Sequence, residues 1–175
     1  MIPKYIQPLS NQKKMSDNII LGMHVFYTTN GSTEIPQNEY LYAAKDQGRY
    51  IHYVTFPTYK RRLEKLIRDF NGTIIFLEDK RFYEDTIERV NAINPVNRFM
   101  IKTEPIDYNL CDTHYKQFAE FLQGHHVTLI GGLYRGDTAF CSKESAKEYG
   151  CVGALSWELR RRKIKHDVDV ELTFK

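Results

Sequence analysis

The sequence predicts an α/β fold, with three layers (α/β/α) around a mostly parallel, Rossmann-like sheet of about six strands. Short apolar segments alternate with amphipathic ones along the chain, as strands alternate with helices in this class. The run at residues 73–77 is apolar throughout, which is typical of a strand buried on both faces of a parallel sheet. The chain has 175 residues, 42% of them hydrophobic and 27% charged, so we expect one folded domain over 1–175, with 1–17 as a polar lead-in.

The strands are predicted from runs of β-branched, aromatic and aliphatic residues. The last run alternates strictly, with Val168, Val170, Leu172 and Phe174 on one side, so it indicates a half-exposed strand at a sheet edge. The predicted strands cover residues 19–28, 50–56, 73–77, 98–102, 127–130 and 167–174.

The helices are predicted from apolar residues at helical spacing. The clearest covers 57–70, where Leu63, Leu66, Ile67 and Phe70 form one stripe before the Asn71-Gly72 stop. Further helices are predicted at 36–47, 83–93 and 115–123, the last capped by Asp112.

The segment after Cys141 has two interpretations. Ala146, Tyr149, Gly150, Gly153, Ala154 and Trp157 share one helical face, which predicts one long helix from 142 to about 162. The alternative breaks the helix at Gly150 and makes 151–155 a strand. We favour the helix.

Strands and helices thus alternate along the chain, and ligands of such folds bind outside the carboxyl ends of the strands. Glycine- or Ser/Thr-rich turns before a helix can hold an anion, and Arg135 could add a bidentate contact. We therefore expect a small anionic, nucleotide-like ligand at the strand-end loops. The candidate binding residues are Thr29, Asn30, Gly31, Ser32, Glu78, Asp79, Gly131, Gly132, Tyr134 and Arg135.

Cys141 is the candidate nucleophile, because a thiol at a helix start is activated by the helix dipole. Lys102, Glu104 and Asp137 are the candidate base and orienting groups, if the strand ends bring them together. No residue pattern in the sequence indicates a cofactor or a metal site.

Residues 99–150 loosely resemble the isochorismatase-like cysteine hydrolases. The resemblance is carried by Phe99-Met100-Ile101-Lys102, by the run from His126 to Gly132, and by Cys141 with Ser145-Ala146. In that family a strand lysine and a cysteine at a helix start act with an aspartate that ends the first strand. The resemblance implies hydrolase chemistry at Lys102 and Cys141, whereas Thr28 stands where the aspartate would be.

Charge, cysteine content and hydropathy indicate which binding partners and which cell compartment to expect. The net charge is +3, but a basic run lies at Arg160–Lys165, where nucleic acid or a protein partner could bind; Asp167, Asp169 and Glu171 follow and would screen it. Three cysteines without paired spacing indicate free thiols and hence the cytoplasm. No apolar run is long enough for a membrane span. Homo-oligomers are compatible with the sequence.

Three functions follow as hypotheses. The first is a small-molecule-binding α/β domain, an enzyme acting on an anionic or nucleotide-like ligand. The second is a cysteine hydrolase that uses Cys141. The third is a non-catalytic interaction protein built on an α/β scaffold.

Overall fold

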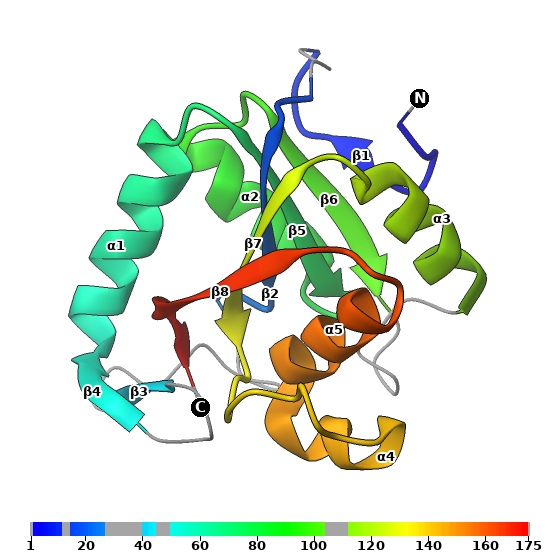
Figure 1. The fold of residues 1–175 in the computed structure, drawn as a ribbon. Coiled ribbons are helices and arrows are strands. Elements are labelled where there is room, and N and C mark those ends of the chain that lie inside the picture. Colours follow the sequence, from blue (N-terminus) through cyan, green and yellow to red (C-terminus); the bar gives the residue numbers. More distant parts are fainter. Residues whose placement is uncertain (1, 12–14, 27–39, 45–49, 104–111, 175) are drawn as a thin grey trace.

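The computed structural model describes most of the chain (Figure 1). It describes residues 2–11, 15–26, 40–44, 50–103 and 112–174, and all structural statements below concern these. For residues 40–44, 50–56 and 112–113, only the backbone is described.

A six-stranded, mostly parallel sheet forms the centre of the molecule, and the predicted fold class is confirmed. Its order is β1-β6-β5-β2-β7-β8, and only β1 pairs antiparallel, with β6. The order reverses at β2, whose neighbours β5 and β7 follow it along the chain. The strands are β1 (Gln7–Pro8), β2 (Asn18–Met23), β5 (Thr73–Asp79), β6 (Arg98–Thr103), β7 (His126–Gly132) and β8 (His166–Phe174).

Helices cover both faces of this sheet (Figure 1). Helices α1 (Phe56–Asp69) and α2 (Tyr83–Ile93) pack on one face through Tyr59, Leu63 and Val90. Helices α3 (Asp112–Leu122) and α5 (Gly150–Arg161) pack on the other, where Phe118 and Leu155 are completely buried. Each face therefore has its own apolar core, separated by the strands.

The helix predicted at 36–47 is wrong for its central part. Residues Tyr40–Ala44 form a strand, β3, which pairs antiparallel with β4 (Tyr50–Thr55) in a separate two-stranded sheet. The predicted strand at 50–56 exists, but it lies outside the main sheet. Tyrosine favours strands, and pairing with a neighbouring segment outweighed the weak helical spacing.

The segment after Cys141 is helical, but it is broken where the alternative placed a break. A short helix α4 (Lys143–Ala146) and a 3-10 turn (Lys147–Tyr149) precede α5, which begins at Gly150. Gly150 has φ 87°, and a Cβ there would clash with the carbonyl oxygen of Leu133. A positive φ together with this close approach requires glycine. The strand that the alternative placed at 151–155 does not form, because these residues belong to α5.

The polar lead-in is partly structured. Ile6 is buried in the core, and Gln7 and Pro8 add a short strand to the open edge of β6. Covering an edge in this way hides unpaired backbone groups.

Arg98 is a buried cation at the start of β6, with 1% of its side chain exposed. Its guanidinium donates hydrogen bonds of 2.7–3.1 Å to the carbonyls of Ile67, Phe70 and Gly72, at the C-terminal end of α1. These carbonyls have no partner within a helix that ends here. Burial lowers the pKa of Arg98 to about 10.

Candidate active site

The candidate site lies where the strand order reverses, at the carboxyl ends of β2, β5 and β7. In open α/β sheets this is the usual place for a ligand or a reacting group. Three side chains from three different elements meet there: His24 directly after β2, Glu78 at the end of β5, and Cys151 at the start of α5.

His24 is held by Glu78. Its backbone has φ 47°, and its N–H donates to the carbonyl of Leu77 at 3.2 Å, which locks it beside β5. The ring nitrogen Nδ1 lies 2.9 Å from Oε1 of Glu78. Only 3% of His24 and 1% of Glu78 are exposed, so the pair is almost free of solvent.

Glu78 is itself fixed on both carboxylate oxygens. The backbone N–H of Asp79 donates to Oε1 at 2.9 Å, and the hydroxyl of Thr86 on α2 donates to Oε2 at 3.1 Å. A carboxylate with both oxygens engaged cannot rotate without losing a buried hydrogen bond, which is costly. The carboxylate therefore sets the orientation of the His24 ring.

Cys151 approaches the same ring from the other side of the sheet. Glu78 shares its side of β5 with Phe76, which belongs to the α1–α2 core, whereas Cys151 belongs to the α3–α5 core. His24 thus bridges the two cores over the strand ends. The Cys151 thiol acts on the imidazole together with Glu78, and both favour the cationic form of the ring.

The loop after β7 fixes the start of α5. The N–H of Val152 donates to the carbonyl of Leu133 at 3.0 Å, and the N–H of Arg135 donates to the carbonyl of Tyr149 at 3.0 Å. Cys151 lies between these two attachment points, so its position relative to the sheet is well determined.

The surroundings favour the cationic form of His24. Burial alone would lower its pKa, but hydrogen bonds with Cys151 and Glu78, together with the charge of Glu78, raise it to about 9. The ring is therefore protonated at neutral pH. A cationic imidazole beside a thiol favours the thiolate, which is the nucleophilic form of cysteine.

This arrangement contains the parts of a nucleophile–base–orienter site. Cys151 would supply a thiolate, His24 would exchange a proton with it, and Glu78 would hold the ring. Catalysis of acyl transfer by cysteine needs these three roles.

Cys141, the nucleophile expected from sequence, lies elsewhere. It precedes Ser142, which caps the four-residue helix α4, and its carbonyl accepts a 2.9 Å hydrogen bond from the indole of Trp157. Among the described residues, no histidine or carboxylate side chain is hydrogen-bonded to its thiol. Cys141 as the nucleophile stays a prediction, while it is Cys151 that interacts with His24.

The residues expected to assist Cys141 are attached to different elements. Lys102 is exposed, with Nζ 4.5 Å from the centre of the Tyr83 ring on α2. Asp137 accepts a 3.1 Å hydrogen bond from Arg160 on α5. Arg135 is exposed and donates to the carbonyl of Glu148 at 3.1 Å. Glu104 lies outside the described residues.

The expected anion-binding loops are only partly described. A Cβ on Gly131 would clash with the backbone of Met23, and one on Gly132 would clash with the ring of Phe174, so both glycines permit close packing within the sheet. Tyr134 is buried. Asp79 forms a bidentate pair with Arg81, which helps to lower its pKa against the opposing effect of burial. Thr29, Asn30, Gly31 and Ser32 lie outside the described residues, and the anion site stays a prediction.

Sequence reasoning did not bring His24 and Cys151 together. His24 was placed within a strand, whereas the strand ends one residue before it. The sequence signal that could have indicated Cys151 is the glycine directly before it. Glycine permits a break in the chain, and the helix that follows begins there.

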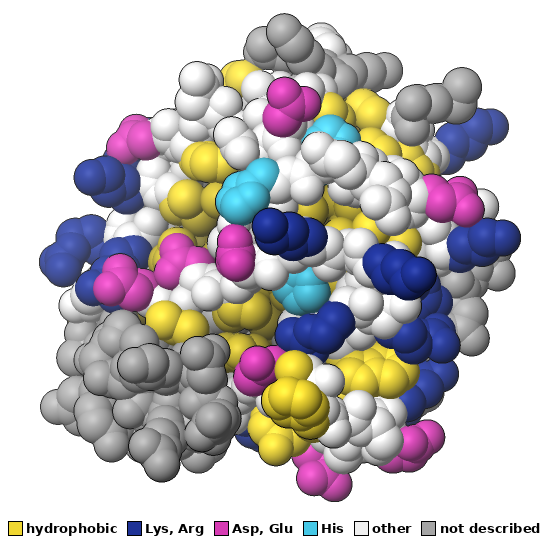
Figure 2. All heavy atoms as spheres, viewed as in Figure 1, with side chains coloured by type: hydrophobic (Ala, Val, Ile, Leu, Met, Phe, Trp, Pro, Cys, Tyr) yellow, Lys and Arg dark blue, Asp and Glu magenta, His cyan; other side chains and the backbone are white. Residues whose placement is uncertain are grey.

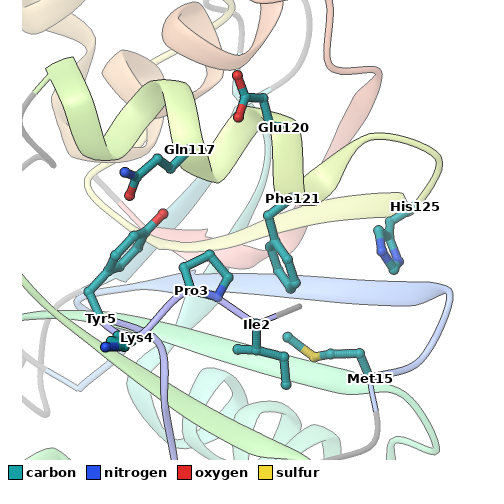
Figure 3. Close-up of a pocket in the computed structure, with 9 residues that line it drawn as sticks. All are labelled: Ile2, Pro3, Lys4, Tyr5, Met15, Gln117, Glu120, Phe121 and His125. Atoms are coloured by element: carbon teal, nitrogen blue, oxygen red, sulfur yellow. The ribbon is translucent and has the colours of Figure 1, made fainter.

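A separate hollow of about 870 Å³ lies at the opposite edge of the sheet (Figure 3). Met15, which precedes β2, and His125, which precedes β7, lie on its rim, so it faces the amino ends of the strands. Ile2, Tyr5 and Phe121 supply most of its apolar wall. Its position separates it from the candidate site.

Comparison with protein-family models, curated proteins and solved structures found no match to this chain. The fold and the site thus define a class only: a Rossmann-like α/β protein with a buried Cys–His–Glu cluster at its switch point. None of the helices in the described ranges combines the length and apolarity that crossing a bilayer requires. Within the same ranges, no three His, Cys, Asp or Glu side chains are grouped so as to hold a metal ion.

Proposed function

We propose that the protein is a cysteine hydrolase whose nucleophile is Cys151. The observation that carries the proposal is the His24 ring, which joins a fixed carboxylate to the thiol at the sheet's switch point. The reaction class is the one expected from the cysteine-hydrolase resemblance, but the nucleophile differs. A free catalytic thiol is compatible with the reducing cytoplasm expected from cysteine usage.

In the proposed reaction, the thiolate of Cys151 attacks the carbonyl carbon of an ester, amide or thioester. The bond to the leaving group breaks, and the proton on His24 passes to that group. Neutral His24 then takes a proton from water, which attacks the thioester, releases the acid and restores the Cys151 thiolate beside protonated His24. Glu78 is a positioning residue, which keeps Nδ1 engaged so that the rest of the ring faces the thiol.

The burial of the site favours a small substrate. Cys151 is only 8% exposed and Glu78 is 1% exposed, so a compact acyl group fits the geometry better than a polymer chain. A site excluded from water also strengthens the interaction between imidazolium and thiolate.

Alkylation with iodoacetamide at pH 7, followed by peptide mass spectrometry, tests the proposal. Exposure alone predicts that Cys141 reacts first, because it is more exposed than Cys151. Activation by His24 predicts the reverse order, with Cys151 reacting at least about tenfold faster. His24→Gln should remove this advantage, and Cys141→Ser should leave the labelling of Cys151 unchanged.

A panel of small p-nitrophenyl esters and thioesters then tests turnover. We expect Cys151→Ser to abolish hydrolysis and Cys141→Ser to retain it. If Cys141 is alkylated faster than Cys151, and Cys151→Ser leaves hydrolysis intact, the proposal is wrong.

A further inference from the structure

A single aromatic side chain stands completely in solvent next to α5. Phe140 has a relative exposure of 103%, whereas the other exposed large hydrophobic residue in the described ranges, Val96, reaches 40%. A fully hydrated phenyl ring gives up the burial that usually stabilises this residue. The ring is therefore accessible to a binding partner.

The turn that carries Phe140 is ordered by its own hydrogen bonds. The N–H of Ala139 donates to the carboxylate of Asp137 at 2.9 Å, and the N–H of Cys141 donates to the carbonyl of Thr138 at 3.1 Å. These bonds close a tight turn with Phe140 at its tip. The ring is thus presented outward by a defined backbone.

The same turn is attached to α5. The hydroxyl of Thr138 donates to the carbonyl of Gly153 at 3.1 Å, and the indole N–H of Trp157 donates to the carbonyl of Cys141 at 2.9 Å. Arg161 lies over the Trp157 ring, with its guanidinium carbon 5.4 Å from the ring centre. Aromatic and cationic groups are therefore held side by side.

Positive charge is concentrated in this part of the chain. Residues 135–165 contain eight Lys and Arg but four Asp and Glu, a balance of +4, which exceeds the +3 of the whole chain. Lys163 and Lys165 are exposed at the turn after α5. Figure 2 shows Lys and Arg side chains beside hydrophobic ones over the region of α5.

The acidic residues of β8 lie close to groups on neighbouring elements. Asp167 lies 4.0 Å from His126 on β7, and the charge of Arg62 on α1 acts on Asp169. The backbone carbonyl of Glu171 also accepts a hydrogen bond from Arg62. The acidic strand is thus engaged with β7 and α1.

We propose that this aromatic–cationic surface, defined as Phe140, Trp157, Arg161, Lys163 and Lys165, binds single-stranded nucleic acid. Unpaired bases stack on aromatic rings regardless of sequence, while Lys and Arg contact the phosphates. A protruding ring can meet an unpaired base, whereas the bases of a duplex are already stacked. Acidic peptides would match the charge but offer no π-face to Phe140. The inference is independent of the proposed hydrolase activity.

Fluorescence anisotropy with a labelled oligo-dT strand tests this surface on the full-length protein. The matched control ligand is an abasic strand of the same length, which keeps the phosphates but lacks bases. We expect the oligo-dT strand to bind more tightly than the abasic one. Phe140→Ala should weaken oligo-dT binding roughly 5- to 100-fold, and Val96→Ala should not.

The charged part of the surface is tested by salt titration. Lys163→Glu combined with Lys165→Glu should weaken both strands and lower the slope of log affinity against log salt. Lys60→Glu on the exposed side of α1 is the matched control and should change neither. Equal binding of both strands, no binding at low salt, or equally tight binding of poly-glutamate would each overturn the proposal, the last in favour of an acidic protein partner.

Discussion

Two histidines, His24 and His166, interact with α5 at Cys151 and Ser156, which are little more than one helical turn apart. The two histidines differ in charge. His24 contacts Cys151 and is held by the carboxylate of Glu78, which helps to raise its pKa to about 9. His166 accepts a 2.7 Å hydrogen bond from the hydroxyl of Ser156, and burial lowers its pKa. The more deeply buried ring, His24, is the one whose pKa is raised, so burial alone does not decide the protonation state.

The partner of the second ring nitrogen makes the difference. Nδ1 of His166 lies 2.8 Å from the carbonyl of Ile164, which can only accept, so Nδ1 carries the proton and Nε2 accepts from Ser156. Neither partner is charged, and the nearby Arg160 opposes protonation further. Cys151 and the carboxylate of Glu78 thus make one histidine a buried cation, while hydroxyl and carbonyl partners keep the other neutral.

Removing the carboxylate should have the largest effect. Glu78→Gln removes the charge partner of His24, which must then stay an unpaired buried cation or lose its proton, and breaking a buried pair costs about 3–5 kcal/mol. Urea unfolding at pH 7 measures this loss. Glu88→Gln, on an exposed position of α2, is the matched control. A cost no greater than that of the control would show that His24 is not a buried cation.

The free energy of unfolding should fall at alkaline pH because His24 loses its proton there; we call this part of the pH profile the alkaline limb. Its pKa is raised from 6.5 to about 9, so its contribution is complete below pH 6.5 and is lost as the pH rises through 9. The loss should amount to roughly 3 kcal/mol. Urea unfolding across this range measures it, and His24→Gln should flatten the curve there. An alkaline limb unchanged in that variant would contradict the assignment.

The fall in the free energy of unfolding at acid pH, the acid limb, should reflect His166. This is the smallest of the three expected effects. Its pKa is lowered in the folded state, so the unfolded chain binds more protons and stability falls as the pH decreases below 6.5. His166→Gln should reduce this slope and leave the alkaline limb intact. Thermal unfolding between pH 5 and 7 distinguishes the outcomes, because an unchanged slope would assign the acid limb to other groups.

The fold was predictable where local pattern and tertiary packing agree. The stripe in α1 and the continuous run in β5 correspond to buried faces, and both elements were confirmed. The segment at 40–44 was predicted as a helix and pairs as a strand, because pairing with 50–55 is a non-local interaction that helical spacing does not report.

The candidate site was predictable only in its location. The sheet edge followed from the alternation of elements, and Glu78 was among the residues that it nominated. The contact of His24 with Cys151 depends on where β2 ends and on the break at Gly150, both set by tertiary structure. Element boundaries are the least certain part of a sequence-based prediction, and here they decided which cysteine meets the histidine.

The buried guanidinium of Arg98 has a consequence for the order of folding. The last carbonyls of α1 receive their hydrogen bonds from a residue of β6, which follows α2 in the chain. The hydrogen bonds that Arg98 gives to this helix end therefore form only when β6 has docked beside β5. Helix termination and sheet assembly become one cooperative event, and local fraying of α1 is coupled to the opening of the sheet.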